Sequence, residues 1–271
     1  MKAAIKLLLD GLLPRLERMT VWQFCLLNLI IDTFDQPVLS THDAKSDIAT
    51  QEFLVAFGDF LKLHHSLSAA YLDKTRFELA LERILSALKR KVSRPGSRTH
   101  RGHDLTVDGI RWSVKTHGDH RIKADSFFIS KFMELGKGRW GKTNLEDLAG
   151  LRDQFLRHLD GYERIFQLRY FHLAATDAMP EVHRYELVEI PKMLLLEAAG
   201  GRLAWSVRSK TTPRCGYCTV TDQHDQVKFR LYFDGAGERK LQIKDLRKDL
   251  CIVHATWEFS SKTPMAIPNV S

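Results

Sequence analysis

Three polar side chains around a predicted hairpin have the residue types needed for phosphodiester chemistry. Asp108-Gly109 lies between two short apolar runs, and this dipeptide is typical of a two-residue hairpin turn. With that turn, directly paired residues share a face of the sheet, so Asp104, Ser113 and Lys115 lie together on a polar face. A carboxylate can hold a divalent metal ion, and a lysine can position or deprotonate an attacking water. The alternative is an ordinary surface hairpin with an incidental salt bridge.

The elements that must position this hairpin are helical before it and mixed after it. Apolar residues recur at helical spacing over residues 21–31, 53–63 and 77–88. After the hairpin we expect strands over 126–130, 165–173, 185–190, 227–233, 240–244 and 251–259, with helices over 148–159 and 191–198. This order predicts an α/β (α+β) fold in which a mixed β-sheet core is flanked by helices.

Composition and charge narrow the class of protein. The 271 residues are 44% hydrophobic and 27% charged, which suits a single globular domain over 1–271 rather than a disordered chain. We expect a mainly helical part over 1–92 and a second part over 93–259. The longest apolar run, residues 21–31, is shorter than the roughly 20 residues of a membrane-spanning helix. Four cysteines and no signal-peptide core indicate a cytoplasmic protein without a membrane partner.

The excess of basic residues points to a polyanion as partner. Lys and Arg number 41 against 33 Asp and Glu, which gives a formal net charge of +8. Residues 89–101 contain six basic residues and no acidic one, directly before the hairpin. We expect this basic loop to contact a phosphate backbone.

The hairpin also carries a family resemblance. Gly102-His103-Asp104 followed by Ser113-Val114-Lys115 resembles the catalytic signature of the PD-(D/E)XK nuclease superfamily. Two positions depart from it, because His103 replaces the usual proline and Ser113 replaces an acidic residue. Longer segments are similar to the SmaI family of type II restriction endonucleases, namely residues 130–138, 162–166, 187–192, 231–235, 238–244 and 251–254. The resemblance extends from about residue 57 to residue 259.

The resemblance implies a specific activity. Such an enzyme has a restriction-endonuclease-like fold, acts as a homodimer, and uses Mg²⁺ to cut both strands of a short palindrome in double-stranded DNA. The site implied is CCCGGG, cut at its centre to leave blunt ends. A cognate DNA methyltransferase that acts on the same site is also implied. Residues 93–259 then contain the catalytic and DNA-recognition core.

The resemblance also assigns catalytic roles. Asp104 becomes a metal ligand and Lys115 the residue that orients the attacking water. Since Ser113 supplies no carboxylate, a second acid must come from elsewhere. We favour Glu78, on the helix before the hairpin, and keep Glu134, at the expected start of a helix after Ser130, as its rival.

A second set of residues is expected to read the DNA. Guanine edges in the major groove pair best with Arg or Lys, and the cytosine amino group pairs with Asp or Glu. The basic candidates are Lys131, Lys137, Arg139, Arg239, Lys240 and Lys244, and Asp234, Glu238 and Gln242 accompany them. Each of these could instead contact phosphate without reading sequence.

Two other classes of function remain open from the sequence. One is a nuclease of the same superfamily that acts in DNA repair, and the other is a DNA-binding protein without catalysis. Cys215 and Cys218 have the spacing of half a zinc site, but His224 is the nearest histidine downstream and a fourth ligand is missing. We therefore do not favour a metal or redox function for this pair.

Overall fold

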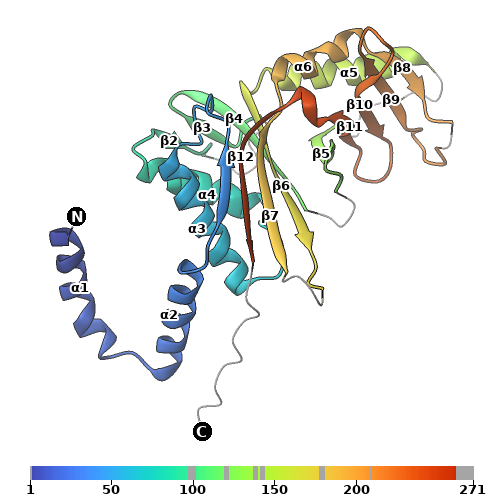
Figure 1. The fold of residues 1–271 in the computed structure, drawn as a ribbon. Coiled ribbons are helices and arrows are strands. Elements are labelled where there is room, and N and C mark those ends of the chain that lie inside the picture. The colour runs from blue at the N-terminus through green and yellow to red at the C-terminus, as the bar shows by residue number, and fades with distance from the viewer. Residues whose placement is uncertain are drawn as a thin grey trace.

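The fold consists of two β-sheets, each covered by its own helices (Figure 1). The computed structural model describes residues 2–96, 102–118, 122–136, 140, 144–176, 181–207 and 209–260. Helices and strands occur in both halves of the described chain, which confirms the predicted α+β class.

The first sheet has seven strands in the order β1-β12-β7-β6-β4-β3-β2. Their bounds are β1 Leu39–His42, β2 Val92–Ser93, β3 Leu105–Val107, β4 Ile110–His117, β6 Arg164–Leu173, β7 Val182–Glu189 and β12 Ile252–Ser260. Strands β4 and β6 run parallel and their other neighbours run antiparallel, so this sheet is mixed.

The second sheet has five strands in the order β5-β11-β10-β9-β8, and all its pairs are antiparallel. The strands are β5 Ser126–Glu134, β8 Arg202–Trp205, β9 Gly216–Thr221, β10 Val227–Asp234 and β11 Lys240–Arg247. Side chains alternate along β10, where Phe229, Leu231 and Phe233 are buried. The opposite face of the strand is therefore left to polar residues.

Helices cover one face of each sheet (Figure 1). The N-terminal helices are α1 Lys2–Leu16 and α2 Val21–Phe34 before β1, and α3 Gln51–Leu67 and α4 Lys74–Ala87 after it; α3 and α4 lie against the first sheet. The second sheet is covered by α5 Leu145–Leu159 and by α6 Lys192–Leu196, which continues into the short η1 Glu197–Gly200, while η2 Lys248–Leu250 precedes β12. Thr50 and Asp73 accept hydrogen bonds at the first turns of α3 and α4, which defines where these helices begin.

Each helix layer closes a hydrophobic core. Between α3, α4 and the first sheet, Phe57 packs on Trp257 with ring centroids 4.8 Å apart, and Trp112 of β4 is fully buried. Between α5 and the second sheet, Phe155 and Phe229 are buried in a separate cluster. The catalytic candidates lie at the margin of the first core, because β4 contributes Trp112 to it.

The hairpin forms with the predicted register. Asp108 and Gly109 both have positive φ, 50° and 84°, as a two-residue turn of this type requires. Leu105 pairs with Trp112 and Thr106 with Arg111. On the opposite, apolar face of the hairpin, Leu105, Val107, Trp112 and Val114 are buried, and Ile110 at the turn is exposed.

The prediction of a helix after Ser130 is wrong, because strand β5 continues to Glu134. Met133 pairs with Leu241 and Ile129 with Ile243, so four residues of β5 oppose two of β11. A bulge of this kind interrupts the alternation of side chains on which the strand prediction depends. Strands β1, β2, β8 and β9 were also not predicted.

No helix among the described residues is both long enough and apolar enough to span a membrane.

Candidate nuclease centre

Asp104 is the centre of a cluster of donors at the open end of the β3–β4 hairpin. Its Oδ1 accepts a hydrogen bond from Lys74 Nζ at 2.6 Å, and its Oδ2 accepts one from the backbone N–H of Val114 at 2.7 Å. Ser113 Oγ donates to Oδ2 at 3.3 Å. The carboxylate is 17% exposed, so it keeps an open side toward solvent.

Electrostatics keeps Asp104 ionised. Burial alone would raise the pKa of this carboxyl, but the charges of Lys115 and Lys74 and the hydrogen bond from Val114 outweigh it. The pKa of Asp104 is therefore held below its ordinary value. An ionised carboxylate with one open side is the group that a hard divalent cation requires.

Lys115 lies nearly buried beside Asp104. Its Nζ is 4.0 Å from Asp104 Oδ2 and donates to Ser113 Oγ at 2.9 Å. It also lies 5.6 Å from the centre of the Phe132 ring. The side chain is 12% exposed, and burial lowers its pKa to about 8, although the Asp104 charge opposes that shift. Lys115 can therefore exchange a proton near neutral pH, which a solvent-exposed lysine cannot.

Glu78 reaches the same place from α4. Lys74, one helical turn earlier, lies 2.6 Å from Asp104 and 3.5 Å from Glu78 Oε1, so one ammonium group lies between two carboxylates. Burial raises the pKa of Glu78, and the Asp104 charge adds to that effect while Lys74 opposes it. Proteins commonly bind Mg²⁺ through one or two carboxylates, and water and phosphate oxygens complete its coordination shell. Asp104 and Glu78 supply two carboxylates at this place. The residues present therefore fit the metal ion that the resemblance implies.

Glu134 lies in a different cluster. It is the last residue of β5, and it forms an ion pair with Lys131 at 2.9 Å. Lys131 also pairs with Glu238 at 2.6 Å, and Glu238 with Lys240 at 2.9 Å. Asp104 therefore shares Lys74 with Glu78, whereas Glu134 pairs with Lys131 of its own strand.

Lys74 is the member of the site that the sequence reasoning missed. It precedes Glu78 by four residues, a spacing that places both side chains on one face of a helix. That spacing was visible in the sequence and could have identified it.

The basic residues expected to read DNA do not form one cluster. Lys131 and Lys240 are exposed or partly exposed, and Glu238 holds both in ion pairs. Arg239 has a φ of 43° at the turn before β11 and lines a hollow with Glu134. Lys137 and Arg139 lie outside the described residues.

Lys244 belongs to a polar face on the second sheet that the sequence did not reveal as a unit. Its Nζ lies 3.6 Å from the centre of the Tyr232 ring, and Tyr232 packs on Tyr217 of β9 with centroids 4.9 Å apart. Gln242 pairs with Tyr232 across the strands, and its amide donates to Asp234 at 3.1 Å. We call Tyr217, Arg230, Tyr232, Asp234, Gln242 and Lys244 the polar sheet face.

A cavity connects this face with the catalytic strand. It has a volume of about 300 Å³, and its lining residues include His117 at the end of β4, Phe128 of β5 and Lys244 of β11. His117 is two residues beyond Lys115, so both lie on the same side of β4. The cavity is therefore two residues along β4 from Lys115, and Lys244 is the member of the polar sheet face that lines it.

The basic loop is partly neutralised within the chain. Arg90 forms an ion pair with Asp108 of the hairpin turn, and Arg94 pairs with Glu82 at 2.6 Å. Residues 97–101 of this loop lie outside the described residues.

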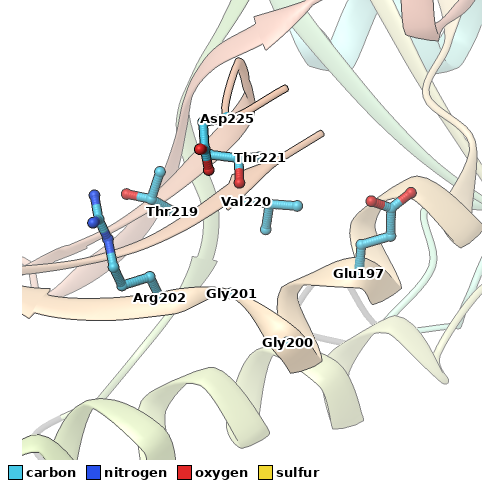
Figure 2. A pocket seen from close by; sticks show the side chains of 8 residues that line it. All are labelled: Glu197, Gly200, Gly201, Arg202, Thr219, Val220, Thr221 and Asp225. Carbon is cyan, nitrogen blue, oxygen red and sulfur yellow. The ribbon is translucent and has the colours of Figure 1, made fainter. Parts of the chain in front are cut away.

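Cys215 and Cys218 have structural surroundings. Both are buried, and no group of three or more potential metal ligands occurs in the described part of the chain. The Cys218 sulfur packs against Gly201, where a Cβ atom would come within 2.3 Å of it. Gly201 belongs to a pocket of about 460 Å³ between η1 and strands β8 and β9, which Figure 2 shows with Glu197 and Arg202 on different sides. Strands β8 and β9, which line this pocket, lie at the opposite end of the two sheets from the β3–β4 hairpin (Figure 1).

Comparison with known proteins places this chain in a family. The SmaI family of type II site-specific deoxyribonucleases matches residues 14–259. The chain is a member of the SmaI family of type II restriction endonucleases. The type II restriction enzyme SmaI of Serratia marcescens is 44% identical over 218 residues, which cover 80% of this chain and 84% of that enzyme. No solved structure matches it. Membership in the SmaI family makes this chain a site-specific deoxyribonuclease, and DNA is its substrate.

Proposed function

We propose that this SmaI-family enzyme cuts both strands of CCCGGG at its centre, with Mg²⁺, at a site built from Asp104, Glu78 and Lys115. The observation that carries the proposal is the shared position of these three side chains, two of which flank the Lys74 ammonium group. The recognition sequence CCCGGG and the blunt ends are proposed because of the resemblance to SmaI.

Within this proposal, Asp104 and Glu78 hold the metal ion. When bound, Mg²⁺ activates water and stabilises the charge that develops on the transferring phosphate. Lys115 orients the attacking water, and with a pKa near 8 a fraction of it is neutral and can accept a proton. Ser113 accepts a hydrogen bond from Lys115 and donates one to Asp104, so it fixes the angle between the two catalytic groups.

Recognition is assigned to basic residues of the second sheet and its turns. Arg239, Lys240 and Lys244 are proposed to contact the duplex, together with Lys131, Lys137 and Arg139. A G·C-only site presents guanine acceptors for these cations, and the Asp234 carboxylate and the Gln242 carbonyl oxygen offer acceptors suited to the cytosine amino group. In this arrangement residues 1–92 contribute Glu78, and residues 93–259 contribute the other catalytic and recognition groups.

The proposal includes a homodimer, because a palindromic duplex is two-fold symmetric and is matched by a two-fold symmetric reader. It also places the enzyme in the cytoplasm beside a DNA methyltransferase that modifies the same sequence and need not bind this chain.

The test is digestion of a long duplex of known sequence with purified protein and Mg²⁺, followed by sequencing of the fragment ends. We expect discrete fragments whose blunt ends divide CCCGGG into CCC and GGG. Fragments that end elsewhere would refute the proposed site but keep the enzyme class. Cutting that follows DNA structure rather than sequence would favour a repair nuclease, and binding without cutting would favour a non-catalytic protein.

A further inference from the structure

The N-terminal arm, residues 2–34, exposes an unusual amount of apolar surface. Of the twenty large hydrophobic residues that are exposed in the described chain, half belong to this arm. They are Ile5, Leu7, Leu8, Leu9, Leu13, Val21, Trp22, Phe24, Ile31 and Phe34. Scattered exposed apolar residues are ordinary, but a contiguous group marks an interaction surface.

The arm projects away from both sheets. In Figure 1, α1 stands apart from the rest of the fold, and α2 lies between α1 and α3. Thr33 is the one buried residue of α2. A helix of 15 residues that packs on nothing is only marginally stable in water, because most helix stability in proteins comes from tertiary packing. A second surface is therefore needed to hold α1 as a helix.

The base of the arm is fixed to the body. Lys62 of α3 is buried, and its Nζ donates to Phe34 O at 3.0 Å and to Gln36 O at 2.9 Å. At the other end of α2, Thr20 and Gln23 form a reciprocal capping box. These contacts define both ends of α2, so the arm leaves the body in a set direction and can present one face to a partner.

We propose that the arm is the dimerisation surface and that a second copy of this chain covers it; this rests on the homodimer of the proposed function. A standard interface uses about 20–30 residues and buries about 800 Å² on each side. Helices α1 and α2, with 15 and 14 residues, provide that number. In a two-fold dimer the same patch meets itself, and an apolar patch is complementary to its own copy.

The distribution of charge favours a second copy over a lipid surface. A helix that lies on a membrane carries Lys and Arg along its polar face. Helix α2 has neither residue, and its single charged side chain is Asp32. In the sequence of α1, Lys2, Lys6 and Asp10 recur every four residues, so the face that they share carries both signs of charge.

The test is the mass of the full-length protein in solution. Sedimentation velocity would compare wild type with the double variant Leu7→Glu, Leu8→Glu, whose two leucines are 75% and 72% exposed in one chain. Glutamate is a good helix former, so the change removes apolar contact without opposing the helix. We expect dimeric wild type, and at least a roughly 100-fold increase in the dissociation constant of the variant from the loss of two buried leucines. Met193→Glu on α6, 73% exposed, is the control and should leave the mass unchanged.

Two results of the sedimentation experiment would overturn the proposal. One is a monomeric wild type at concentrations that cut DNA, and the other is a variant that stays as dimeric as wild type. Flotation of wild type, but not of the variant, with phospholipid vesicles would assign the arm to a membrane instead. If the variant does not fold, hydrogen exchange of wild type decides, because α1 amides must become more protected as protein concentration rises.

Cleavage assays on the same samples separate this inference from the proposed function. A monomeric variant that nicks one strand, beside a wild type that cuts both, supports the two together. If wild type binds DNA without cutting it, the proposed function fails, and the mass measurement still decides the role of the arm.

Discussion

Replacing Lys115 with Met should abolish cleavage and at the same time stabilise the protein. The pKa of Lys115 is about 8 instead of the ordinary 10.5. One pKa unit corresponds to about 1.4 kcal/mol, so at pH 7 the charged ammonium destabilises the folded state by about 3 kcal/mol. The Met variant loses the hydrogen bond to Ser113, which is worth about 1 kcal/mol. We therefore expect the free energy of unfolding to rise by about 2 kcal/mol.

The pH dependence gives this prediction its sign. Between pH 8 and pH 10.5 the unfolded chain keeps a proton on Lys115 that the folded chain has lost, so wild type gains stability as pH rises through this window. The difference in the free energy of unfolding between the Met variant and wild type is therefore largest below pH 8 and becomes smaller above it.

The assay combines urea unfolding at pH 7 and pH 9.5 with single-turnover cleavage of a duplex that contains CCCGGG. Loss of a general base or water-orienting group should reduce the rate by about 10²–10⁴-fold, while DNA binding remains. A variant that is less stable than wild type at pH 7, or whose stability difference does not change with pH, would refute the reasoning about burial. Retained cleavage would remove Lys115 from the catalytic set.

Three further predictions concern the metal site, acid stability and recognition. Glu78→Gln should raise the Mg²⁺ concentration needed for cleavage, or lower the cleavage rate, by at least about 10-fold. Glu134→Gln should cleave like wild type. The reverse result in a metal titration would exchange the roles of the two residues. Burial and the neighbouring His183 lower the pKa of His65 to about 3, so stability should fall as pH drops below 6.5, by about 1.4 kcal/mol per pH unit. Urea unfolding at pH 6.5 and pH 5 checks this, and an equal slope in His65→Gln would contradict it. Arg239→Ala should cost about 1–3 kcal/mol at one base pair if it reads guanine, whereas an equal loss in binding to all sequences would make it a phosphate contact.

The catalytic hairpin could be predicted from the sequence because its information is local. Asp108-Gly109 sets the turn, and alternation over residues 104–107 and 110–115 sets the faces, so the Asp104–Lys115 arrangement follows from a short stretch of chain. Glu78 was favoured through family resemblance, and its contact with Lys74 supports that choice without testing its role.

The polar sheet face could not be predicted in the same way, because its assembly is non-local. Tyr217 joins it only because β9 pairs with β10, and β9 was not recognised as a strand. The prediction that Glu134 begins a helix was wrong for a related reason, because the bulge of β5 depends on the pairing of this strand with β11. Such registers are decided by partners distant in sequence, which periodicity within one segment does not report.

The most direct test of the nuclease centre is the isosteric change Asp104→Asn. It keeps the shape of the side chain but removes the charge that Lys74 and Lys115 face. Thr106→Ala, on the same polar face of the hairpin, is the matched control. With Mg²⁺ and a plasmid that carries one CCCGGG site, we predict complete linearisation by wild type and by the control, and none by Asp104→Asn despite retained DNA binding. Linearisation by Asp104→Asn at the wild-type rate would contradict the account.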